Sequence, residues 1–237
     1  MNHKQLTFAR EFRGFNQTEL AESIKGLSQS NLSKFEKGLG ILSEELQNRI
    51  IDFLGFPKNF FERRINSNIE HAHYRKKSSI LKSEVVQFEN KCKLMGYIID
   101  EMSESVVWPD FNFQILNVED GYSPMYIANY NRKILKLAKD EPVKDIISLM
   151  ESNGIIIYEI NAHEKFDGIS FFTDKGYPVI IINKSFTNDR KRFTLAHELG
   201  HIHLHNDNNA PLFVQKNGID YYLTSCDLVG NKLTQIL

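Results

Sequence analysis

The sequence predicts an α+β protein in which an all-helical N-terminal domain precedes a helical segment and a small mixed domain. Apolar residues recur at helical spacing throughout the N-terminal part. After Gly154 the pattern changes to short runs of β-branched residues, starting with residues 155–160. A second helix-spaced stretch then carries His197-Glu198-x-x-His201, so a small sheet is followed directly by a helix rich in metal-binding side chains.

Composition is typical of a soluble globular chain, with 237 residues, 41% hydrophobic and 25% charged. No apolar run approaches the length of a membrane span, and the first residues lack the pattern of a signal peptide. We therefore expect a cytoplasmic protein with no membrane partner. Cys92 and Cys226 are far apart and neither belongs to a C-x-x-C pair, which disfavours a disulfide framework or a thiolate zinc site.

Charge is distributed unevenly along the chain, although the net charge is only −1. Residues 1–82 contain 14 Lys and Arg against 9 Asp and Glu, a net charge of +5, so the remaining residues sum to −6. The first part is therefore suited to a polyanion such as DNA, and the rest is not.

Four helices are expected in the N-terminal domain, residues 1–62, at 4–13, 17–24, 28–37 and 43–54, with a last one around 58–64. The second and third are short and joined through Gly26, which is the helix-turn-helix arrangement. Leu32 and Phe35 anchor the third helix. Its other positions present polar side chains that can bond base edges and phosphates: Gln29, Ser30, Asn31, Ser33 and Lys34.

The stretches N-Q-T-E-L-A-E-S-I (16–24) and S-Q-S-N-L-S-K-F-E-K-G (28–38) resemble the XRE family of helix-turn-helix repressors. The resemblance implies that Gln17 and the polar start of the third helix, Ser28 and Gln29, touch an operator in double-stranded DNA, which such domains usually bind as homodimers. From Ala21 to Glu36 the chain is one residue longer than the family pattern. We expect the extra residue, near Gly26, to reshape the turn.

Residues 63–82 form the predicted linker, rich in basic and small polar residues. Its sequence His73-Tyr-Arg-Lys-Lys-Ser-Ser has two interpretations: a solvated run of charge, or an arm that contacts phosphates. Fused members of the family named below tend to carry a similar aromatic-Arg-Lys element. His71 and His73, two positions apart, are not proposed as metal ligands.

The segment after Ser83 is expected to be a long helix with one apolar stripe that includes Cys92, Ile99 and Met102. Residues 106–126 are expected to form an irregular connection, followed by helices at 128–139 and from Pro142 to Met150. Strands are predicted at 155–160, 168–173 and 178–183. The backbone of a substrate could pair with either of the last two strands.

The last predicted helix, around residues 191–205, places His197 and His201 four positions apart on one face. Two imidazoles so placed can hold one Zn²⁺ ion, and Glu198 then lies beside the water that the metal activates. Glu198 is the candidate general base.

The motif T-L-A-H-E-L-G-H-x-x-x-H, preceded by F-D-G-I-S-F and V-I-I-I-N, resembles the ImmA/IrrE family of metallopeptidases. The resemblance implies a zincin-like domain at residues 83–237 and a zinc-dependent endopeptidase that cleaves a repressor or antitoxin-like protein. In the family the third zinc ligand is a Glu on the following helix.

No Glu follows His205 in this chain, so the third ligand is the point of departure from the family. Asp227 is the predicted substitute, with Cys226 and His205 as alternatives. The domain is also expected to be shortened at its C-terminal end relative to the family. The alternative function is therefore a DNA-binding regulator or antitoxin-like protein whose peptidase domain is inactive.

Overall fold

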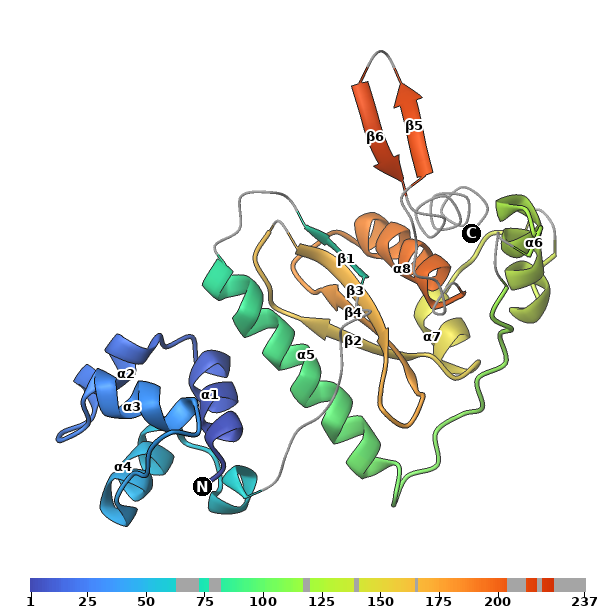
Figure 1. Cartoon of the computed structure of the whole chain (residues 1–237). Helices are drawn as coiled ribbons and strands as arrows, with labels where there is room; N and C mark the ends of the chain where they lie inside the picture. The colour runs from blue at the N-terminus through green and yellow to red at the C-terminus, as the bar shows by residue number, and fades with distance from the viewer. Residues whose placement is uncertain are drawn as a thin grey trace. The chain divides into compact units, whose positions relative to one another are not determined.

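The computed structural model describes residues 1–62, 73–76, 82–116, 120–138, 141–164, 166–203, 212–216 and 219–223 (Figure 1). The chain forms two compact units, Met1–Ser67 with Ser79–Tyr97 and Asn68–Ser78 with Ile98–Leu237. Both helices and a β-sheet are present, which confirms the α+β prediction at that level. Among the described residues, no helix combines the length and the apolar character needed to cross a membrane.

The first unit is built from short helices: α1 (His3–Phe12), α2 (Gln17–Ser23), α3 (Gln29–Glu36), α4 (Glu44–Leu54) and the 3-10 turn η1 (Lys58–Phe61). An Asn or Ser side chain caps each α-helix by accepting a backbone N–H of its first turn; these residues are Asn2, Asn16, Ser28 and Ser43. The connection from α2 to α3 includes Gly26, whose φ of +87° is one that glycine adopts without strain.

The helix predicted around residues 58–64 is present as the short 3-10 helix η1, and residues 63 and 64 lie outside the described residues. Pro57 precedes this turn and provides no side-chain cap. Phe61 of η1 is buried in a core formed mainly by aliphatic side chains of α1 to α4, among them Leu6, Leu20, Leu32, Ile50 and Leu54.

Helix α5 (Lys82–Met102) contributes residues to both units. In the first unit, Gln87 Nε2 donates to the Phe12 carbonyl at 3.1 Å and Asn90 Nδ2 to Glu11 Oε2 at 3.2 Å. Residues 83–97, which the sequence assigned to the second domain, thus belong to the first unit in the structure. Of the predicted apolar stripe, Cys92 is fully buried and Met102, at the helix end, is exposed.

The second unit contains a four-stranded sheet in the order β1-β3-β4-β2. Its strands are β1 (His73–Lys76), β2 (Ile156–Ile160), β3 (Phe166–Phe172) and β4 (Pro178–Asn183). β3 is antiparallel to β1 and to β4, and β2 is parallel to β4. Three strands were predicted to within two residues, but β1 lies in the predicted linker and was missed.

Helices α6 (Pro124–Ile134), α7 (Ile146–Glu151) and α8 (Asn188–His203) complete the described core of this unit. α6 begins four residues before its predicted start, because Ser123 caps it and Pro124 occupies its first turn. α7 begins after the cap Asp145 and not at Pro142. α8 packs on β3 and β4 through an apolar core that includes Ile180, Ile182, Leu195 and Leu199. A separate two-stranded sheet, β5 (Leu212–Lys216) with β6 (Ile219–Leu223), follows.

Candidate metal centre

The first turns of α8 are tied to the sheet by basic side chains. Arg190 forms an ion pair with Asp167 of β3, and Lys191 Nζ lies 2.8 Å from Glu159 Oε1 of β2. Arg192 donates to two backbone carbonyls just before α7. These contacts fix the position of the helix on the sheet, and with it the side chains two turns further along.

His197 and His201 lie one helical turn apart, and their Nε2 atoms are 3.2 Å from each other. Two nitrogen ligands of one tetrahedral zinc, each about 2.0–2.1 Å from the metal, are separated by about 3.3 Å. The two imidazoles therefore already have the separation that a shared Zn²⁺ requires. Both are buried, with exposed fractions of 6% and 8%.

Glu198 is the most deeply buried of the three motif residues, at 1% exposed. Ser170 of β3 donates its hydroxyl hydrogen to Glu198 Oε2, with an O···O distance of 2.7 Å. This hydrogen bond orients the carboxyl group. The sequence analysis missed Ser170. The available signal was a lone hydroxyl within the otherwise largely apolar strand F-D-G-I-S-F-F.

Gly168 allows α8 to approach β3 closely. A Cβ atom at this position would lie 2.6 Å from Thr194 Cγ2 and 3.3 Å from Glu198 Cγ. Ordinary carbon–carbon contacts are about 3.5–4.0 Å, so any side chain here would push the helix away from the strand. The glycine thus helps to bring Glu198 within reach of Ser170.

His203 has a structural environment and does not join the two other histidines. Its side chain is fully buried, with Nδ1 2.8 Å from the Gln114 carbonyl oxygen and Nε2 2.6 Å from the Asn131 side chain. Burial lowers the pKa of His203 to about 4, although the hydrogen bond to Gln114 opposes that shift. At neutral pH the ring is uncharged and carries one N–H, for which the Gln114 carbonyl and Asn131 Oδ1 are the acceptors within reach. It links the end of α8 to α6 and to the segment before α6.

The third ligand predicted from the sequence, Asp227, lies outside the described residues, as do its alternatives Cys226 and His205. Within the described ranges, no group of three or more His, Cys, Asp or Glu side chains is placed to hold a metal ion. The structure therefore brings together His197, Glu198 and His201 and leaves the rest of the predicted ligand set as a prediction.

A polar network in the first unit links α1, α2 and α3. Arg10 donates to both carboxylate oxygens of Glu36, at 2.7 and 2.9 Å, and both side chains are largely buried. Gln17 Nε2 donates to Glu36 Oε2 at 2.7 Å, and Gln29 Nε2 donates to Gln17 Oε1 at 3.1 Å. A buried ion pair thus orients two of the residues predicted to contact DNA.

The other predicted DNA-contacting residues lie on or next to α3. Ser28 caps the helix, and it is exposed together with Gln29, Ser30, Asn31 and Lys34. Ser33 and Gln17 are half-buried. Leu32 and Phe35 are buried, which confirms their predicted anchoring role.

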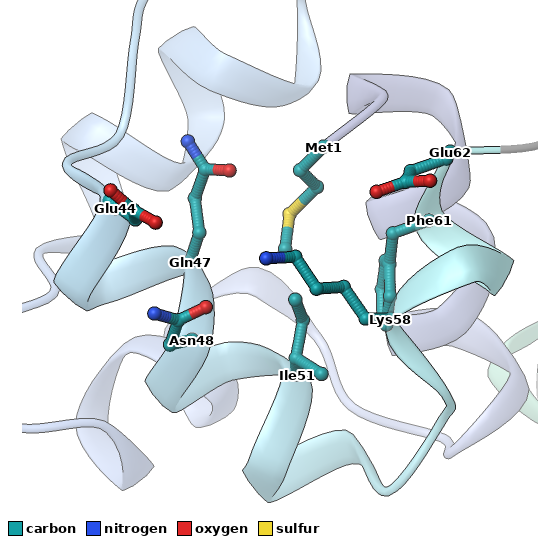
Figure 2. Close-up of a pocket in the computed structure, with 8 residues that line it drawn as sticks. All are labelled: Met1, Glu44, Gln47, Asn48, Ile51, Lys58, Phe61 and Glu62. Atoms are coloured by element: carbon teal, nitrogen blue, oxygen red, sulfur yellow. The ribbon is translucent and has the colours of Figure 1, made fainter.

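A pocket of about 280 Å³ also lies in the first unit, between α4, η1 and the N-terminus (Figure 2). Its polar lining comes from Glu44, Gln47 and Asn48 of α4 on one side and from Lys58 and Glu62 on the other. None of the residues predicted to contact DNA or metal lines it, so it is separate from both candidate sites.

Two convergent imidazoles beside a buried carboxylate, all on one helix that packs on a small sheet, are the arrangement of a metallopeptidase helix. Comparison with protein families agrees: the model of the IrrE N-terminal-like domain, Peptidase_M78, matches residues 150–221. The matched stretch includes β2, β3, β4 and the motif of α8. Comparison with curated proteins and with solved structures gives no match.

Proposed function

We propose that this protein is a zinc-dependent endopeptidase with an N-terminal DNA-binding unit, and that it controls transcription by cleaving a repressor or antitoxin-like protein. The observation that carries the enzymatic part is the 3.2 Å separation of the His197 and His201 Nε2 atoms beside the buried Glu198. The match to the Peptidase_M78 model supports the same chemistry.

In this proposal His197 and His201 hold Zn²⁺, with Asp227 as the third ligand. When bound, zinc acidifies water and polarises the peptide carbonyl. Glu198 accepts the proton of the attacking water and passes it to the leaving amine. Ser170 keeps the Glu198 carboxylate in one orientation through its 2.7 Å hydrogen bond.

The test of this part is the metal content of the purified full chain, together with cleavage of fluorescein-labelled casein. We expect one zinc per chain, lost in His197→Ala and kept in His163→Ala, which changes an exposed histidine of the same unit. Glu198→Gln should keep the zinc and lose cleavage. Wild-type protein without zinc would overturn the proposal.

For the first unit we propose contact with operator DNA through α3 and Gln17, by a homodimer. The buried Arg10–Glu36 pair orients Gln17, and Gln17 in turn orients Gln29. Because both side-chain amides are already ordered, they lose little conformational entropy when they bind a base edge. The net charge of +5 in residues 1–82 favours a polyanion.

Selection from randomised duplex DNA tests this part, followed by titrations at several salt concentrations. Gln29→Ala and Asn31→Ala should each weaken binding to the selected sequence by about 1–3 kcal/mol. Asp52→Ala, an exposed change on α4, serves as the control. Equal affinity for selected and random duplexes would contradict sequence-specific binding.

The second candidate function is a DNA-binding regulator whose peptidase domain is inactive. It is favoured by the incomplete ligand set, since the residues that the structure describes supply two histidines and no third side chain for a metal. This function predicts selective DNA binding that does not change with a chelator, and no casein cleavage dependent on Glu198.

A further inference from the structure

The sheet edge nearest the candidate catalytic residues is covered by the protein's own chain. β4 is paired on both sides, with β3 and with β2, so it offers no edge to a substrate. The outer side of β3 is paired with β1 from Phe166 to Ser170. Over that stretch, β3 is therefore not free to receive a substrate.

β1 is the edge strand next to β3, the strand that contacts Glu198. Ser170, the residue of β3 that donates to Glu198, is the register partner of His73 in β1. An extended peptide on the outer side of β3 would pass Ser170 at one strand spacing, about 4.8 Å. A peptide on the open side of β2 would lie two strand spacings further from Ser170, which is about 10 Å further than a peptide on the outer side of β3.

We propose that residues 73–76 occupy the substrate-binding edge of β3, so that the protein competes with its own substrate until β1 leaves the sheet. The inference rests on the proposed peptidase function and adds a means of regulation. Peptides commonly bind by adding a strand to a sheet edge, and β1 makes the same antiparallel backbone pairing from within the chain.

The pairing of β1 is suited to displacement. The strand has only four residues, and its register shifts between Tyr74 and Lys76, which interrupts the ladder. By contrast, β3 and β4 pair without a shift over five residue pairs. A longer substrate strand would form more backbone hydrogen bonds with β3 than β1 does.

A reversible covalent lock tests the inference. Tyr74 and Ile169 are register partners, so Tyr74→Cys with Ile169→Cys can place a disulfide between β1 and β3. The assay uses the zinc-loaded full chain and fluorescein-labelled casein. The oxidised double variant should cleave casein at least about tenfold more slowly than the same protein after reduction. The reason is that the disulfide lowers the fraction of molecules in which β1 has left the edge of β3. Tyr74→Cys alone is the control and should show no such redox effect.

A second variant replaces residues 73–76 by Gly-Ser-Gly-Ser, and thermal unfolding checks that it folds. Cleavage should become several-fold faster than in the wild type. If β1 is only a structural strand, the replacement lowers stability without raising the rate, and the lock leaves the rate unchanged; either result overturns the inference.

Failure of the proposed function would be seen separately, as the absence of any Glu198-dependent cleavage in every variant. Binding then decides the inference. In a Glu198→Gln background, fluorescence anisotropy should show tighter binding of labelled casein to the reduced and Gly-Ser variants than to the oxidised one. Equal binding to all three would refute occupation of the edge by β1.

Discussion

Substitution of Gly168 by alanine tests how closely α8 packs against the sheet. The new Cβ would lie 2.6 Å from Thr194 Cγ2, an overlap of about 1 Å relative to an ordinary contact, and 3.3 Å from the Ile181 carbonyl oxygen. Overpacking of this kind costs about 1–3 kcal/mol, and the lower chain entropy of alanine in the unfolded state offsets about 0.4–1 kcal/mol. We expect Gly168→Ala to lower the free energy of unfolding by about 1–2 kcal/mol.

Thr194→Ser removes the methyl group that the alanine meets and keeps the hydroxyl that donates to the Arg190 carbonyl at 2.9 Å. Alone it should cost about 1 kcal/mol, as small deletions of buried methyl groups do. In the double variant the closest contact is gone. The loss of stability should therefore be about 1 kcal/mol smaller than the sum of the two single losses. Thr194→Val retains a methyl group at that place and should not rescue Gly168→Ala.

The assay is urea unfolding followed by the fluorescence of Trp108, the single tryptophan, which lies in the second unit. If the loss of stability in the double variant equals the sum of the two single losses to within about 0.5 kcal/mol, the contact between position 168 and Thr194 is not the cause of the destabilisation by Gly168→Ala.

Three further predictions concern buried polar groups. The His203 pKa of about 4 lies below its ordinary value of 6.5, so the unfolded state binds more protons between these pH values and stability falls as pH drops through that window, by about 3 kcal/mol. Urea titrations at several pH values should show this slope in the wild type and lose it in His203→Gln; an unchanged slope would contradict the assignment. Ser170→Ala should lower kcat/KM for casein about tenfold at unchanged zinc content, and full activity would exclude a positioning role. Glu36→Ala leaves the buried Arg10 guanidinium without its carboxylate and should destabilise the first unit by about 3 kcal/mol, measured by thermal loss of helicity, whereas Glu45→Ala, from an exposed pair, should cost less than 1 kcal/mol.

Local sequence signals predicted the elements that depend on neighbours in the chain. The apolar spacing of residues in α1 to α4 predicted those helices to within a residue or so. β2 and β4 followed from runs of β-branched residues. The motif of α8 gave two imidazoles and a carboxylate on adjacent positions of one helix, because helical spacing alone fixes that arrangement.

Features that depend on distant parts of the chain were not predictable in the same way. β1 pairs residues about a hundred positions from β3, and its basic sequence has the composition of a linker. Ser170 acquires its role only when Gly168 lets α8 approach the strand. The structural role of His203 was not predicted, because its partners, Gln114 and Asn131, lie far earlier in the sequence.

The route of the chain between the two units limits how this protein can be divided or recombined. β1 belongs to the second unit, while the described residues before it, up to Glu62, and those from 83 to Tyr97 after it belong to the first. A protein made by joining two genes end to end would pass from one unit to the other once. This chain passes between its two units three times. A fragment that starts at residue 83 lacks an edge strand of its sheet, and one that stops at residue 62 lacks the α5 contacts of its helices. The two units can therefore be exchanged among proteins only together with the segment that crosses between them.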